Sequence, residues 1–242
     1  MRQIGTYGQA PQHVELSARA TIPPSAAGLT GNAVAAALLA SPVAATFSGD
    51  VEGSTARGEV GVEAGPLSVP GELRTVNAAS YLRTGASWYA LGSSVDPVAL
   101  TQLPVRLKEV VSEPEITGSE EIGGVMTQHV AATVDPERAL SLVRSSTGTT
   151  VDLTGIEVES ASTDLNIDAS HHVRRLELRL DGRARDGKSV RADVTLSVSP
   201  GVAFTVVAPP DARPVARLPQ DLAGSLLGGS TTSTPSLLPE AP

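Results

Sequence analysis

Apolar and polar residues alternate one by one along much of this chain. Near the N-terminus Val14, Leu16 and Ala18 take every second position, and Glu15 and Ser17 fill the positions between them. Alternation with this period is typical of β-strands that bury one face. We therefore predict a sheet with one apolar and one polar face. The same pattern recurs at residues 43–51, 60–62, 176–180 and 190–198.

Short turn signals separate the predicted strands. Gly123-Gly124 joins residues 116–122 to residues 125–134, and a similar glycine-containing turn follows residues 79–83. Turns of two residues connect antiparallel neighbours, and no strand–helix–strand rhythm is seen. We predict nine or ten antiparallel strands, of which residues 202–207 form the last.

Three short helices are predicted between the strands. The first is the alanine-rich run at residues 30–40. The second begins at Asp96-Pro97, a capping residue followed by proline in the first turn, and the third begins in the same way at Asp135. The second helix has an apolar stripe at helical spacing, made of Leu100, Leu103, Leu107 and Val111.

The elements predict an α+β protein with a single folded domain at residues 12–218. Residues 1–11 are predicted to be flexible. Residues 219–242 are rich in Pro, Ser, Thr and Gly and are predicted to be a disordered tail. We expect truncation after Leu218 to leave the melting temperature almost unchanged.

Composition excludes several classes of function. The formal net charge of −8 is a poor match for the phosphate backbone of a nucleic acid. Aromatic residues make up 2% of the chain, which leaves few platforms for stacking on bases. The chain has no cysteine, so disulfides, thiolate metal sites and cysteine nucleophiles are excluded.

No motif for catalysis is found. The sequence lacks the G-x-S-x-G elbow, the S-x-x-K pair, the glycine-rich phosphate loops and the H-E-x-x-H zinc motif. We expect a protein that is not an enzyme and needs no cofactor.

The histidines and glutamates have a chemical and a structural interpretation. His129 lies within a predicted strand, where it could act in catalysis or pH sensing, or bond to a neighbouring strand. His171 and His172 are adjacent and would face opposite sides of a strand. We predict a structural role for His129, an exposed polar turn for His171 and His172, and no metal site. A run of glutamates could suggest calcium, but a solvated strand face fits its spacing better: Glu113, Glu115, Glu120 and Glu121.

Four motifs resemble those of the actinobacterial LppX/LprG lipoproteins. A hairpin carries Tyr81-Leu82-Arg83 and then Trp88-Tyr89-Ala90-Leu91. Residues 120–130 are similar to the family's "G-x-E-x-x-G-V-x-T-x-H-Y" hairpin, with Val130 in place of the aromatic residue. Residues 164–180 resemble its "V-x-I-D-x-x-x-x-V-R-R-L" hairpin, and residues 202–209 its last strand.

The resemblance covers residues 43–212 and implies a LolA-like fold. In that fold a curved antiparallel half-barrel holds short helices on its concave face. It also implies a monomeric, extracytoplasmic protein of the cell envelope that carries a lipid or glycolipid. The sequence departs from the family because it has no lipobox cysteine and no signal peptide. We expect membrane association only through an anchor or leader outside this chain, and a leader encoded upstream of Met1 or removed.

The leucine stripe has two interpretations. It packs on the sheet as ordinary core, or it lines a ligand cavity between helix and sheet. In the second case the binding residues are Phe47, Leu100, Leu103, Leu107 and Val111. Two functions follow: a carrier of a hydrophobic ligand, or a regulatory or scaffolding module that binds a protein partner through the same half-barrel.

Overall fold

One open, curved antiparallel sheet dominates the computed structural model of the chain. The structure describes residues 10–23, 41–77, 79–92, 110–138 and 156–215. Within these ranges the strands are β1 (Gln12–Thr21), β2 (Val43–Glu52), β3 (Thr55–Ala64), β4 (Leu67–Val76), β5 (Ala79–Thr84), β6 (Ser87–Gly92), β7 (Val111–Ile122), β8 (Val125–Val134), β9 (Ile156–Asp168), β10 (Val173–Ala184), β11 (Ser189–Pro200) and β12 (Arg213–Pro214).

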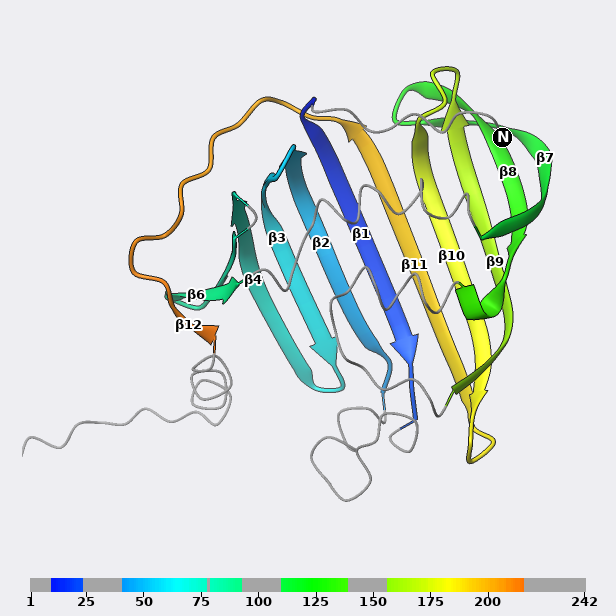
Figure 1. Cartoon of the computed structure of the whole chain (residues 1–242), viewed down its shortest axis with the longest axis horizontal. Helices are drawn as coiled ribbons and strands as arrows, with labels where there is room; N and C mark the ends of the chain where they lie inside the picture. The colour runs from blue at the N-terminus through cyan, green and yellow to red at the C-terminus, as the bar shows by residue number, and fades with distance from the viewer. Residues whose placement is uncertain (1–9, 24–40, 78, 93–109, 139–155, 216–242) are drawn as a thin grey trace, which may run out of the picture.

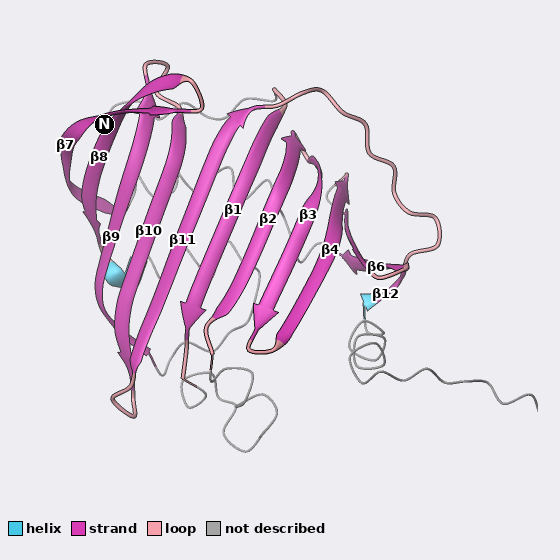
Figure 2. Cartoon of the chain, turned by 180° about the vertical axis from the view of Figure 1, so that it is seen from behind, coloured by secondary structure: helices cyan, strands magenta, loops and turns pink. Residues whose placement is uncertain are grey.

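The strand order places the N-terminal strand in the middle of the sheet. The order is β12-β6-β5-β4-β3-β2-β1-β11-β10-β9-β8-β7, so β1 joins two meanders, β2 to β6 and β7 to β11 (Figure 1). β12 pairs with β6 in parallel over two residues, and the other ladders are antiparallel. Both ends of the sheet bend toward the same side and do not meet (Figures 1 and 2).

The register gives the sheet one apolar and one polar face, as predicted. Leu16 of β1 lies opposite Phe47 on one side and Leu196 on the other, so the apolar positions of neighbouring strands line up. The intervening positions carry charged and hydroxyl side chains, such as Glu15 opposite Ser48. We refer to these two sides as the apolar face and the polar face.

Glycines let the strands approach closely at one place on the apolar face. Gly49 of β2 and Gly58 of β3 are direct partners in the ladder. A Cβ at Gly49 would lie 2.1 Å from the backbone oxygen of Arg57, and a Cβ at Gly58 would lie 2.5 Å from that of Ser48. Since side chains of ordinary size cannot fit there, the pair allows the sheet to coil toward its apolar face.

One helical turn lies within the described residues, at positions 136–138. The backbone N–H of Arg138 donates to Asp135 Oδ1 at 3.0 Å, which is the predicted capping contact. No helix of the described residues is long and apolar enough to cross a bilayer. The predicted helix at residues 30–40 and the body of the second helix lie outside the described residues. So do most of the N-terminal segment that was predicted to be flexible and all of the predicted tail.

The second helix does not extend to Val111, contrary to the prediction. Val111 begins β7 and lies opposite Val134 of β8. The apolar spacing from Leu107 to Val111 fits a helix, but a β-branched residue with a buried partner across a ladder fits a strand equally well. The predicted second helix was therefore extended one turn too far along the sequence.

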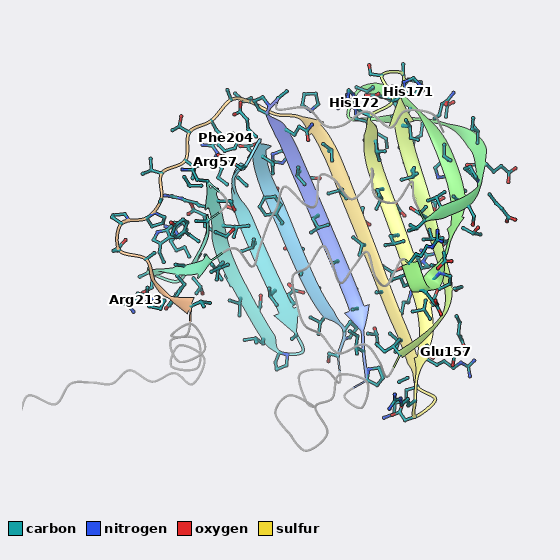
Figure 3. All side chains as sticks on the ribbon, viewed as in Figure 1. Arg57, Glu157, His171, His172, Phe204 and Arg213 are labelled. Carbon is teal, nitrogen blue, oxygen red and sulfur yellow. The ribbon has the colours of Figure 1, made fainter. Side chains whose placement is uncertain are left out.

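The predicted last strand at residues 202–207 is also wrong. This segment is extended but has no ladder partner, because β1 and β10 already occupy both edges of β11. It runs along the outside of the sheet to β12, and its Phe204 stacks on Arg57 with the guanidinium carbon 4.9 Å from the ring centroid (Figure 3).

Candidate ligand-binding face

The apolar face has a fully buried part on the C-terminal meander. Leu176 of β10 is 0% exposed and lies between Leu165 of β9 and Leu196 of β11, which are each 1% exposed. We name as the closed half nine buried apolar-face residues of β8, β9 and β10: Val130, Ala132, Val134, Ala161, Thr163, Leu165, Leu176, Leu178 and Leu180. Long leucine side chains fill this part of the fold as a packed core.

The other end of the same face, on the N-terminal meander, remains open to solvent. Val62 of β3 is 45% exposed, and Ala45, its partner on β2, is also exposed. We name as the open corner six apolar-face residues of β2, β3 and β4, none of which is buried: Val43, Ala45, Val62, Ala64, Leu67 and Val69. Five of these six side chains are alanine or valine.

Phe47 lies between the closed half and the open corner. It is 5% exposed and belongs to the hydrophobic core cluster. Its ring lies over Gly58, since a Cβ at that glycine would be 2.8 Å from Phe47 Cε2. Its ladder partner Val60 is only partly buried, and the next pair of residues along these strands already belongs to the open corner. Phe47 therefore forms the inner boundary of the open corner.

The other predicted ligand-binding residues are placed only in part. Val111 is on the apolar face, partly buried and packed against the core cluster. It is on β7, at the end of the sheet and six strands away from β2, which carries Phe47. Leu100, Leu103 and Leu107 lie outside the described residues.

The polar face carries ion pairs. Asp50 accepts from His13 Nδ1 at 3.0 Å and pairs with Arg57 at 3.2 Å. Burial alone would raise the pKa of Asp50, but the contacts with His13 and Arg57 hold it below its usual value. Asp193 is similar: Arg179 and Arg191 lower its pKa against the opposing effect of burial. Ion pairs in contact with solvent, such as these, are typical of the outer surface of a protein.

A groove of about 790 Å³ also lies on the polar face, over β2 to β5. Charged side chains line it, among them Asp50, Arg57, Glu59, Glu72 and Arg83. Because an acyl chain would gain nothing by leaving water for such surroundings, this groove is not a candidate for an apolar ligand.

His129 connects three strands. Its Nδ1 is 2.8 Å from Thr117 Oγ1 on β7, and its Nε2 is 3.1 Å from Asp164 Oδ1 on β9. A hydroxyl, an imidazole and a carboxylate are thus connected in the same order as in a hydrolase triad. Thr117 is exposed, however, and none of the three residues lines the groove. The contacts fit the predicted structural role, because they attach the edge strand to its neighbours.

Asp168 organises the turn between β9 and β10. Its Oδ1 accepts from the backbone N–H groups of Ser170 and His172, and its Oδ2 accepts from Arg174 at 2.7 Å. Burial alone would raise its pKa, but the N–H of His172 and the Arg174 guanidinium hold the pKa below its usual value. His171, at the tip of this turn, is exposed with φ of 64° (Figure 3).

The glutamates of β7 face solvent, as predicted. Glu113, Glu115 and Glu121 are exposed, and Glu120 accepts from Asn166 Nδ2 at 3.3 Å. Within the described part of the chain no three His, Cys, Asp or Glu residues come together as metal ligands would.

The comparisons with known proteins establish the fold. No family model matches the chain, and no curated protein matches its sequence. LprF from Mycobacterium bovis is similar in structure, with a TM-score of 0.50 and 16% identity over 86% of this chain and 92% of LprF. The lipoprotein LppX from Mycobacterium tuberculosis gives a TM-score of 0.47 and 18% identity over 84% of this chain and 92% of LppX. The curved, open antiparallel sheet expected from the sequence motifs is thus confirmed.

Proposed function

We propose that this protein binds a hydrophobic ligand, a lipid or a glycolipid, on the apolar face of its sheet and carries it within the cell envelope. The open corner is the observation that supports this proposal most strongly. It presents six adjacent apolar side chains, partly in contact with water, on the apolar face of the sheet. Folded proteins gain stability by burying such surface, and a bound apolar chain would bury it.

Binding of this kind requires no catalytic group. Each methylene of an acyl chain that leaves water contributes roughly 0.8 kcal/mol to binding. The fold shared with LprF is compatible with this role, and the envelope location rests on the motif resemblance to lipoproteins. The stripe of Leu100, Leu103 and Leu107 would supply the opposite wall of the cavity under this proposal.

Mass spectrometry of organic-solvent extracts tests the function. Protein purified from its native cells under non-denaturing conditions should yield a stoichiometric lipid. The delipidated protein should then bind a fluorescent long-chain fatty acid in a saturable manner. Extracts without lipid, together with no binding of the fatty acid, would reject the carrier function. Fractionation of cells that express the full-length product tests the location, and purely cytosolic protein would contradict it.

A protein-binding module is the second candidate, and the edge strand β7 is its support. β7 has twelve residues, almost all exposed, including Ile116 at 64%. The edge is nevertheless poorly suited to strand addition. It carries Pro114, Glu113 at φ of 50° and two register shifts in its ladder with β8, which are features that natural sheets use to prevent edge pairing.

A further inference from the structure

The open corner is a patch of small apolar side chains, none of which is buried. Its residues form two adjacent rows across three strands: Val43, Ala64 and Leu67 in one row, and Ala45, Val62 and Val69 in the next. β1 continues both rows with Ala20 and Ala18, which are partly buried. The rows span roughly 14 Å, or three inter-strand spacings of ~4.8 Å.

Glycines lie beside the open corner on the same face of the sheet. The row beyond Phe47 contains the partners Gly49 and Gly58, and Gly71 of β4 lies opposite Val60. A Cβ at Gly71 would lie 2.7 Å from the backbone oxygen of Arg83 and 3.1 Å from Val60 Cγ2. The strands therefore approach closely on this face, next to the open corner.

We propose that the open corner is where the hydrocarbon chain of a lipid enters the fold and lies, and that the closed half is a permanent core which the ligand never occupies. This inference rests on the proposed function and adds the position of the chain on the sheet.

The chemistry of the corner favours a hydrocarbon chain over other occupants. None of its six side chains carries a hydrogen-bonding group, so a sugar or a charged group would lose water without gaining a partner. The corner has only two rows of three residues, which suits a thin flexible chain, whereas protein interfaces of standard size bury about 800 Å² on each partner.

The closed half leaves no comparable space. Its leucines are between 0% and 8% exposed and contact neighbouring strands on both sides, as Leu178 does between Thr163 and Val194. A ligand would have to displace packed side chains to enter there, which makes the two parts of the face separable by experiment.

Val62→Trp is the test, with binding of a fluorescent long-chain fatty acid and melting temperature as readouts. Val62 is 45% exposed, so the indole has room and fills the corner without overpacking a core. We expect fatty-acid affinity to fall at least tenfold while the melting temperature stays within about two degrees of the parent. Ser68→Trp is the matched control, since Ser68 is exposed on the polar face beside Val69 and its substitution should leave binding unchanged.

Val69→Trp provides a second, independent variant in the same row and should reproduce the loss. Unchanged affinity in both corner variants, with a parent that binds, overturns the position of the chain but not the carrier function. A parent that binds no fatty acid after delipidation rejects the carrier function itself. A dimer in sedimentation that Val62→Trp converts to monomer would make the corner an interface between copies of the chain, which also overturns the inference.

Discussion

The closed half and the open corner belong to one continuous apolar face but are built from different side chains. Leucines on β9 and β10 fill the closed half, and Leu176 and Leu165 are at most 1% exposed. Alanine and valine predominate in the open corner, where Val62 is 45% exposed. Alternation of apolar residues is equally regular in both, so the pattern alone does not distinguish core from binding surface. The size of the side chains does distinguish them.

The largest expected effect on stability is in the closed half. Leu176→Ala should lower the free energy of unfolding by about 2–5 kcal/mol, because it leaves a cavity in a packed core. Urea denaturation measures the change, and folded Leu176→Ala protein should still bind the fatty acid with parental affinity. The comparison between the two regions fails if Val62→Ala costs as much as Leu176→Ala.

A glycine of the apolar face should give the next largest effect. Gly58→Ala places a Cβ 2.5 Å from the oxygen of Ser48 and 2.8 Å from the Phe47 ring, so we expect a loss of about 1–3 kcal/mol from overpacking. Gly118→Ala is the control in β7, since a Cβ there meets nothing within 4 Å. Equal thermal stability of the two variants would show that the close approach of β2 and β3 is not required.

Asp168 should make the end of the closed half sensitive to acid. Because its folded pKa is lowered, its contribution is present above the unfolded pKa near 3.8 and is lost as pH falls through the folded pKa. Asp168→Asn should cost about 1–3 kcal/mol at neutral pH, as expected for hydrogen bonds to a buried charge. Melting curves from pH 2 to pH 7 should show a weaker acid dependence in the variant.

Asp193→Asn is the counterpart of Asp168→Asn on the polar face. The Asp193 side chain is 40% exposed, and solvent screens its pairs with Arg179 and Arg191, so its loss should cost at most about 1 kcal/mol. A larger effect at Asp193 than at Asp168 would contradict the assignment of the polar face as a solvated surface.

The smallest effect on stability is expected in the open corner. Val62→Ala removes two methyl groups that are already partly in water, so the free energy of unfolding should change by less than about 0.5 kcal/mol. A loss of several kcal/mol would show that the corner is packed core.

Local sequence predicted most strands but not how they assemble. The alternation at residues 14–22 and the Gly123-Gly124 turn are local signals, and both appear in the structure. The pairing of β1 with β11 connects residues far apart in sequence, which no local period encodes. β4 was missed because Pro70-Gly71 interrupts its apolar pattern, although Leu67, Val69 and Leu73 share one face.

The candidate site was predictable only in part. The alternation of apolar and polar residues at positions 43–51 correctly placed Phe47 on the apolar face. The exposure of Ala45 and Val62 could not be predicted, because it depends on which side chains lie across the ladder and above the sheet. The partners of His129 are on β7 and β9, and only the strand register brings Thr117 and Asp164 to it.

Site-directed fluorescence at Val62 tests the account most directly. Because the chain has no cysteine, Val62→Cys and Ser68→Cys each provide a single labelling site for an environment-sensitive fluorophore. On titration of the delipidated protein with an unlabelled long-chain fatty acid, the label at residue 62 should shift to the blue and saturate, while the label at residue 68 stays constant. A constant signal at residue 62, under conditions where the fatty acid demonstrably binds, would contradict the position of the ligand at the open corner.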